Sequence, residues 1–196
     1  MQLGHSQGFL SFIAPKINQH LGCNFSANTL AGLYNKVEPS RIRIDADEVT
    51  YPCHILLRFE AEKALIEGNL EVSELPDFWS SQMQSLLGIN TDGDYKNGCM
   101  QDIHWTLGEL GYFPSYTLGA MYAAQLRFAM EQSIGELEPM LRTGQFEAIF
   151  TWLDKHIWSK GSLLSTDELM RQATGEILNG DYLRQHLSQR YLSVSR

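Results

Sequence analysis

The sequence lacks the patterns that usually mark a self-contained catalytic site. None of its six histidines is followed by glutamate, so there is no HExxH pattern, and none of its three cysteines forms a CxxC pair. No GxGxxG or P-loop pattern occurs either. Because zinc and nucleotide sites depend on such spacings, we expect no complete metal site and no nucleotide site from these residues.

Cationic clusters and long apolar runs are also missing. The net charge is -8, and no group of Lys and Arg could follow a phosphate backbone, so nucleic acid is not an expected partner. No stretch approaches the ~20 apolar residues that span a bilayer, so no membrane association is expected. An odd number of widely spaced cysteines indicates a reducing compartment. The start of the chain does not resemble a signal peptide, and we expect a cytoplasmic protein.

What is present is typical of a soluble helical protein. The 196 residues are 43 % hydrophobic and 19 % charged, and apolar residues recur at spacings of three and four along most of the chain. We expect an all-α fold in one compact multi-helix domain over residues 1–196, with a kink or a break at Pro15 and an extended segment at Lys36–Asp47. The expected helices are Phe9–Leu21, Ser26–Tyr34, Thr50–Glu67, Pro76–Leu87, Pro114–Gly135, Phe146–Trp158, one that begins at Ser165, and Gly180–Leu192.

Two of these helices carry explicit expectations about burial. In Ser26–Tyr34 the inward side chains are expected to be Leu30, Leu33 and Tyr34. The strongest helix, Thr50–Glu67, is expected to bury an apolar face made of Ile55, Leu56, Phe59, Leu65 and Ile66. His54, near its start, is expected to be a structural histidine with its hydrogen bonds satisfied.

The segment Gly98–Tyr116 (GCMQDIHWTLGELGYFPSY) holds a chemically useful set of side chains. An imidazole at His104 and phenols at Tyr112 and Tyr116 are donors that can bind a peptide carbonyl or a developing oxyanion. Residues and spacing alone also allow a simpler interpretation, in which His104 and Trp105 are core residues.

A second polar group follows in the segment that precedes the Thr50–Glu67 helix. Arg41 and Arg43 could grip a carboxylate through two parallel hydrogen bonds. The alternative is a solvated loop in which Asp45, Asp47 and Glu48 complement the positive end of the helix.

Three segments carry a resemblance to a known family. Ile42–Leu70 (IRIDADEVTYPCHILLRFEAEKALIEGNL) resembles the I-R-x-x-A-D segment and the following helix of the Taq-type (thermostable carboxypeptidase 1) metallocarboxypeptidases. Gly98–Trp105 (GCMQDIHW) matches the G-x-x-Q-D-x-H-W motif of that family, and Gly111–Leu126 resembles the segment that follows it. More weakly, Met1–Lys16 resembles the helix after the family's zinc site, although His5 stands where the family pattern has Arg.

The resemblance implies a two-lobed, zincin-like helical fold around a deep groove. It implies an enzyme that releases single residues from the carboxyl end of a peptide substrate, with zinc as cofactor in the complete enzyme. The family's HExxH and its downstream Glu precede the region that Met1 resembles. The chain would thus correspond to the carboxyl-terminal part, bind no metal itself and be inactive alone.

The resemblance also implies roles for individual residues. His104 and Tyr112 would stabilise the oxyanion, with Tyr116 as the other candidate for the tyrosine role, and Arg43 would bind the terminal carboxylate of the substrate. The remaining residues assigned to substrate binding and to support of the site are Gln101, Asp102 and Asp47.

Two other interpretations stay open. The chain could be a helical module that binds peptide ends without cutting them, or a piece of a longer protein with no function of its own. A lobe without its partner exposes a large apolar surface, and such surfaces drive association. We therefore expect homo-oligomers.

Overall fold

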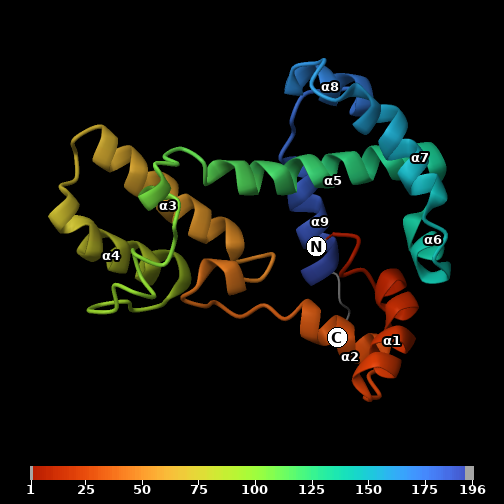
Figure 1. Ribbon diagram of the computed structural model, residues 1–196, viewed down its shortest axis with the longest axis horizontal. Coiled ribbons are helices and arrows are strands. Elements are labelled where there is room, and N and C mark those ends of the chain that lie inside the picture. The colour runs from red at the N-terminus through yellow and green to blue at the C-terminus, as the bar shows by residue number, and fades with distance from the viewer. Residues whose placement is uncertain (1, 193–196) are drawn as a thin grey trace. The chain divides into compact units, whose positions relative to one another are not determined.

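The fold is all-helical in the part of the chain that the structure describes. The structure is a computed structural model, and it describes residues 2–192, among which there is no β-strand (Figure 1). No helix within this range is long and apolar enough to cross a membrane. The contacts divide the chain into two compact units, described separately here: the first runs up to Asn35 and resumes at Ala120, and the second is Lys36–Gly119.

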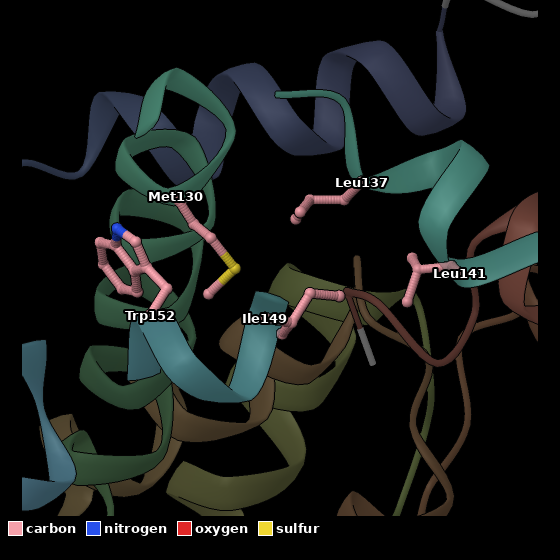
Figure 2. Close-up of a cluster of buried hydrophobic side chains, with 5 residues drawn as sticks. All are labelled: Met130, Leu137, Leu141, Ile149 and Trp152. Carbon is pink, nitrogen blue, oxygen red and sulfur yellow. The ribbon is translucent and has the colours of Figure 1, made fainter. Parts of the chain in front are cut away.

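The first unit contains helices from both ends of the chain and the larger part of α5 (Figure 1). Its helices are α1 (Gln7–Leu21), α2 (Ala27–Tyr34), α5 (Pro114–Ile134, from Ala120 on), α6 (Leu137–Thr143), α7 (Glu147–His156), the 3-10 turn η4 (Trp158–Lys160), α8 (Thr166–Thr174) and α9 (Asp181–Tyr191). Side chains of α5, α6 and α7 form its main apolar cluster (Figure 2), made of Met130, Leu137, Leu141, Ile149 and Trp152. A smaller cluster joins α1 to α2.

The signals for helix ends in the sequence are confirmed in this unit. Ser26 caps α2 by accepting a hydrogen bond from the backbone N–H of Thr29 at 3.0 Å. Ser165 and Glu168 form the reciprocal capping box at the start of α8. Of the two outcomes expected at Pro15, the break does not occur, because α1 continues through Pro15 to Leu21.

Other differences from expectation concern exposure and short helices. Leu30 is buried, but Leu33 and Tyr34 are 61 % and 50 % exposed, so α2 buries only one of the three side chains expected inside. The sequence did not predict α6, whose seven residues are too few to show a clear period.

The second unit is built around two longer helices that pack on each other. Its elements are the 3-10 turn η1 (Arg43–Asp45), α3 (Tyr51–Ile66), the 3-10 turn η2 (Val72–Glu74), α4 (Leu75–Leu87), the 3-10 turn η3 (Trp105–Leu107) and the first residues of α5. The core is formed by Leu57 of α3, Trp79 and Met83 of α4, and Cys99. The extended segment expected at Lys36–Asp47 is wrong in its last part, where η1 forms.

The buried face of α3 differs from the face expected from the sequence. Leu56, Phe59 and Ile66, expected inside, are 46 %, 42 % and 68 % exposed. Ile55 is buried as expected, and Leu57 and Ala61 are buried too, but the inward face also carries polar side chains at every fourth position. These are His54, Arg58 and Glu62, which are 0 %, 0 % and 3 % exposed. This stripe contacts the segment that contains GCMQDIHW.

Candidate active site

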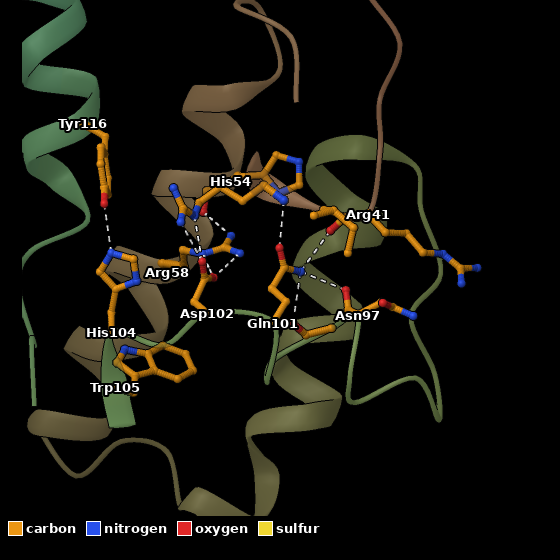
Figure 3. A network of polar contacts seen from close by, with 12 residues as sticks. Arg41, His54, Arg58, Asn97, Gln101, Asp102, His104, Trp105 and Tyr116 are labelled. Carbon is orange, nitrogen blue, oxygen red and sulfur yellow. Dashed lines mark hydrogen bonds and ion pairs between the residues drawn. The ribbon is translucent and has the colours of Figure 1, made fainter. Parts of the chain in front are cut away.

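Two buried arginines share the carboxylate of Asp102 (Figure 3). Arg58 donates from Nε to Oδ2 at 2.6 Å, and Arg43 donates from Nε to Oδ1 at 2.9 Å. The side chains of Asp102, Arg43 and Arg58 are 6 %, 7 % and 0 % exposed. A charge buried to this extent is tolerated only when it is paired and hydrogen-bonded, so Asp102 is what allows both arginines to lie inside.

The pKa values of the two arginines reflect this environment. Burial lowers the pKa of Arg58 to about 10, although Asp102 acts against that change. For Arg43, burial also acts to lower the pKa, but the hydrogen bond and charge of Asp102 outweigh it and the pKa is raised. Both guanidinium groups are therefore cationic at neutral pH, and one shared carboxylate leaves one positive charge uncompensated in this trio.

Arg43 lies between the carboxylate and a group of aromatic rings. Its Nη1 donates to the hydroxyl of Tyr51 at 2.7 Å. Its guanidinium carbon is 5.0 Å from the ring centroid of Tyr116 and 5.5 Å from that of Phe113, within the range of cation–π attraction. The fork expected to grip a substrate carboxylate is thus already partly engaged by Asp102 and Tyr51.

Gln101 joins two backbone segments. Its Oε1 accepts from the backbone N–H of Arg43 at 2.8 Å, and its Nε2 donates to the carbonyls of Arg41 and Asn97 at 3.0 and 2.8 Å (Figure 3). The side chain therefore fixes η1 against the turn that begins the GCMQDIHW motif. This contact brings Arg43 into register with Asp102.

His104 lies in an aromatic environment. Its Nε2 is 3.0 Å from the hydroxyl of Tyr116, its ring is 4.4 Å from that of Phe113, and the ring of Tyr112 is 5.6 Å away. The imidazole is 7 % exposed, and its Nδ1 is buried without a hydrogen-bond partner among residues 2–192. Burial raises the pKa of Tyr116, which keeps that phenol protonated. Tyr112 differs in being 48 % exposed, with no hydrogen bond from its hydroxyl among residues 2–192.

Glu62 was not among the site residues predicted from the sequence. Its Oε1 accepts from Nε1 of Trp105 at 2.8 Å, and its Oε2 accepts from the backbone N–H of Gly111 at 3.0 Å. The signal that could have found it is the i, i+4, i+8 spacing of His54, Arg58 and Glu62, which places three polar side chains on one helix face.

His54 is buried as expected, but it is not satisfied. Neither ring nitrogen has a hydrogen-bond partner among the described residues. Its pKa is lowered to about 4, first by burial and then by the positive charges of Arg58 and Arg43; Asp102 and the backbone of Ser40 act in the opposite direction. The ring is therefore neutral at pH 7.

Comparison with known proteins identifies the family of this chain. The family model described as "Carboxypeptidase Taq (M32) metallopeptidase" matches residues 1–191. The chain belongs to the M32 metallopeptidase family. It is 43 % identical to carboxypeptidase 1 of Bacillus subtilis, over 98 % of this chain and 39 % of that protein. It is 38 % identical to thermostable carboxypeptidase 1 of Thermus thermophilus, over 98 % of this chain and 38 % of that protein.

Solved M32 structures show the same fold. Metallocarboxypeptidase 1 of Trypanosoma cruzi is 44 % identical and superposes with a TM-score of 0.95, over 98 % of this chain and 41 % of that one. The carboxypeptidase of Pyrococcus furiosus is 34 % identical with a TM-score of 0.90, over 96 % of this chain and 38 % of that one. The chain thus spans about two fifths of the length of these M32 relatives.

The M32 chain shows no ligand set for a metal in the range described. Among residues 2–192 no group of three or more His, Cys, Asp or Glu side chains is placed to hold an ion. The histidines and carboxylates of the candidate site, namely His54, His104, Asp102 and Glu62, are instead engaged with or buried among side chains of the second unit.

Asp47 is not brought together with the other candidate residues. Its carboxylate accepts hydrogen bonds at 2.9 Å from the backbone N–H groups of Glu38, Val49 and Thr50. Burial acts to raise its pKa, but these bonds outweigh it and the pKa is lowered. Asp47 therefore fixes the approach to α3, and any support it gives the site passes through that helix.

One further pattern has a structural explanation. Gly4–Gly8 (GHSQG) matches the GxSxG spacing of serine hydrolases. Those enzymes place the serine on an exposed turn between a strand and a helix. Here Ser6 is 4 % exposed, and its hydroxyl caps α1 by accepting from the N–H of Phe9 at 3.2 Å. Its geometry is that of a helix cap.

Proposed function

We propose that this chain is the carboxyl-terminal part of a zinc-dependent metallocarboxypeptidase that releases residues from the carboxyl end of peptides. The observation that supports this most directly is the meeting of His104, Tyr112 and Tyr116 beside the pair of arginines on Asp102. A half-exposed phenol next to a buried imidazole is a suitable donor set for an oxyanion. Family membership is the second support.

The donors act on the substrate as follows. When the scissile carbonyl is attacked, its oxygen becomes negatively charged, and hydrogen bonds from Nε2 of His104 and the hydroxyl of Tyr112 stabilise that charge. Before substrate binds, Nε2 is held by Tyr116 at 3.0 Å, which keeps the ring oriented. Such bonds often rearrange when the substrate enters. Zinc is proposed to be bound by residues outside this chain, in the part of the longer M32 relatives that the chain does not span.

Arg43 is the candidate for the terminal carboxylate of the peptide. The uncompensated positive charge of the Arg43–Asp102–Arg58 trio favours an anion nearby. The proximity of Arg43 to the ring of Tyr116 connects this charge to the oxyanion donors. Gln101 and Asp102 would keep Arg43 in place, since both bond to it directly.

A chimera tests the activity. This chain would replace the matching 39 % of Bacillus subtilis carboxypeptidase 1, to which it is 43 % identical. The proposal expects release of carboxyl-terminal residues from peptides, lost on chelation and restored by zinc, with no release from peptides whose carboxyl end is amidated. A folded chimera without activity would count against it.

The chain by itself tests the binding role. Without ligands for zinc it is expected to show no turnover, while calorimetry should detect a peptide with a free carboxyl end more strongly than the amidated peptide. Equal affinity for both would exclude recognition of the carboxylate. Chelator-sensitive turnover by the chain alone would overturn the proposal that zinc is bound by residues outside it.

A further inference from the structure

One carboxylate holds both ends of the segment that separates the two oxyanion donors. Trp105 immediately follows His104, and Gly111 immediately precedes Tyr112. Glu62 accepts from Trp105 through Oε1 at 2.8 Å and from Gly111 through Oε2 at 3.0 Å. The two oxygens of Glu62 thus hold the two ends of the loop 105–111. The residues just outside these ends are the donors His104 and Tyr112.

We propose that Glu62 is a positioning residue, which sets the separation and orientation of His104 and Tyr112. The proposal rests on the proposed function of these two residues, and it adds a residue of α3 to which that function assigns no part. Glu62 does not reach the substrate, since it is 3 % exposed and both of its oxygens are engaged. Its effect passes through the loop.

The chemistry of the two bonds requires a carboxylate. Both partners are N–H donors, and an ionised carboxylate has two acceptor oxygens, whereas an amide has one acceptor and one donor end. Glutamine at this position would therefore direct an NH2 group at either Trp105 or Gly111. Hydrogen bonds to a charged acceptor are also stronger than those to a neutral one.

The anchor is rigid at both of its ends. Glu62 lies one turn after Arg58 on α3, so it is fixed to the same helix face as the Arg58–Asp102 bond. Trp105 packs edge-on against Trp79 of the core, with ring centroids 6.2 Å apart. At the other end, the backbone of Gly111 has a φ of 78°, a conformation that residues other than glycine rarely adopt. The loop therefore has little freedom while Glu62 holds it.

The carboxylate of Glu62 is separate from the one that pairs with the arginines. Arg43 and Arg58 bring two positive charges into this unit, and Asp102 is one buried carboxylate. Glu62, on the buried face of α3, is a second buried carboxylate. It does not compete with Asp102 for the guanidinium groups, because its oxygens are used by Trp105 and Gly111.

The first experiment uses the chain as it is, and does not depend on peptidase activity. Hydrogen exchange by NMR would follow the Nε1–H of Trp105 and the N–H of Gly111 in the wild type and in Glu62→Gln, with Trp105→Phe to assign the indole signal. Exchange at one or both sites is expected to become at least ~10-fold faster in Glu62→Gln. Glu60→Gln, a half-buried position on the same helix, is the matched control and should leave both rates unchanged. Unchanged protection in a folded Glu62→Gln protein would overturn the proposal.

The second experiment uses the chimera with Bacillus subtilis carboxypeptidase 1. Displacement of catalytic groups by about 1 Å can cost ~100-fold in rate, so Glu62→Gln is expected to lower kcat by ~10- to 100-fold with KM within ~3-fold. An unchanged kcat, or a loss confined to KM, would refute the positioning role. If Glu62→Gln does not fold, Trp105→Phe removes one bond only, and a kcat unaffected by that change is equally decisive. A wild-type chimera without activity would refute the proposed function, whereas the exchange rates would still decide whether Glu62 fixes the loop.

Discussion

Arg58 donates a hydrogen bond from Nε to Oδ2 of Asp102 at 2.6 Å, across 44 positions of the sequence. The contact joins the buried face of α3 to the motif that contains His104. Because Arg58 is wholly buried, the bond replaces contacts with water that the free ions would otherwise keep. The relationship explains why the inward face of α3 carries charged side chains among its apolar ones.

Removal of Asp102 is therefore expected to be costly. Asp102→Ala leaves two buried guanidinium groups without their shared acceptor, and loss of one partner of a buried ion pair costs about 3–5 kcal/mol. Urea unfolding followed by circular dichroism would measure this change in the free energy of unfolding. Asp77→Ala, at an exposed position in the first turn of α4, is the control and should cost about 1 kcal/mol or less. Similar costs for the two variants would contradict the structural role of the pair.

Local signals in the sequence predicted much of the fold. Apolar spacing located the long helices, and cap residues such as Ser26 and Ser165 located helix starts, because both effects act within a few residues. The GCMQDIHW motif located the candidate site by resemblance. These features depend on residues a few positions apart, so they can be predicted directly from the sequence.

The burial of α3 could not be predicted in this way. The helix carries apolar residues on several sides, so its period does not choose between the face of Phe59 and the face of Arg58. The choice depends on Asp102, Trp105 and Gly111, which lie 43 to 49 positions away from their partners. Contacts at such separations form only in the tertiary structure, so the spacing of apolar residues along the helix does not predict them.

His54 predicts a specific dependence of stability on pH. Its folded-state pKa of about 4 lies below the unfolded value of 6.5, so the unfolded chain binds more protons between these values. Stability from the neutral ring is complete above pH 6.5 and decreases as the pH falls toward about 4, with a total loss of about 3 kcal/mol from this group. Below that pH the ring is protonated in both states, and it contributes no further change.

Substitution of the ring isolates this effect. His54→Gln is expected to flatten the decrease in the free energy of unfolding between pH 6.5 and about 4, relative to the wild type. Because the pKa of His156 is also lowered, by burial and by Lys155 and Lys160, the wild type and the variant must be compared at each pH. NMR titration of the His54 ring gives its pKa directly, and a midpoint near 6.5 would contradict the assignment.

Tyr112 and Tyr116 are expected to differ in their effects on rate. The hydroxyl of Tyr112 is half-exposed and has no partner among the described residues, whereas that of Tyr116 lies 3.0 Å from Nε2 of His104. In the active chimera, Tyr112→Phe removes an oxyanion donor and should lower kcat by ~100-fold or more. Tyr116→Phe removes only the contact that orients His104, and should cost ~10-fold or less. The reverse order of effects would assign the donor role to Tyr116.

Exposed apolar side chains at the carboxyl ends of α1 and α2 predict association of the chain in solution. Leu21, Leu33 and Tyr34 are 73 %, 61 % and 50 % exposed. Burial of one leucine side chain contributes about 1.5–3 kcal/mol, so Leu33→Lys should raise the dissociation constant of the homo-oligomer by at least ~10-fold. Light scattering coupled to size exclusion, over a range of concentrations, measures this shift. Leu163→Lys changes a side chain that is 85 % exposed on a turn before α8, and it serves as the matched control. A wild-type chain that stays monomeric at every concentration would show that this surface does not drive self-association.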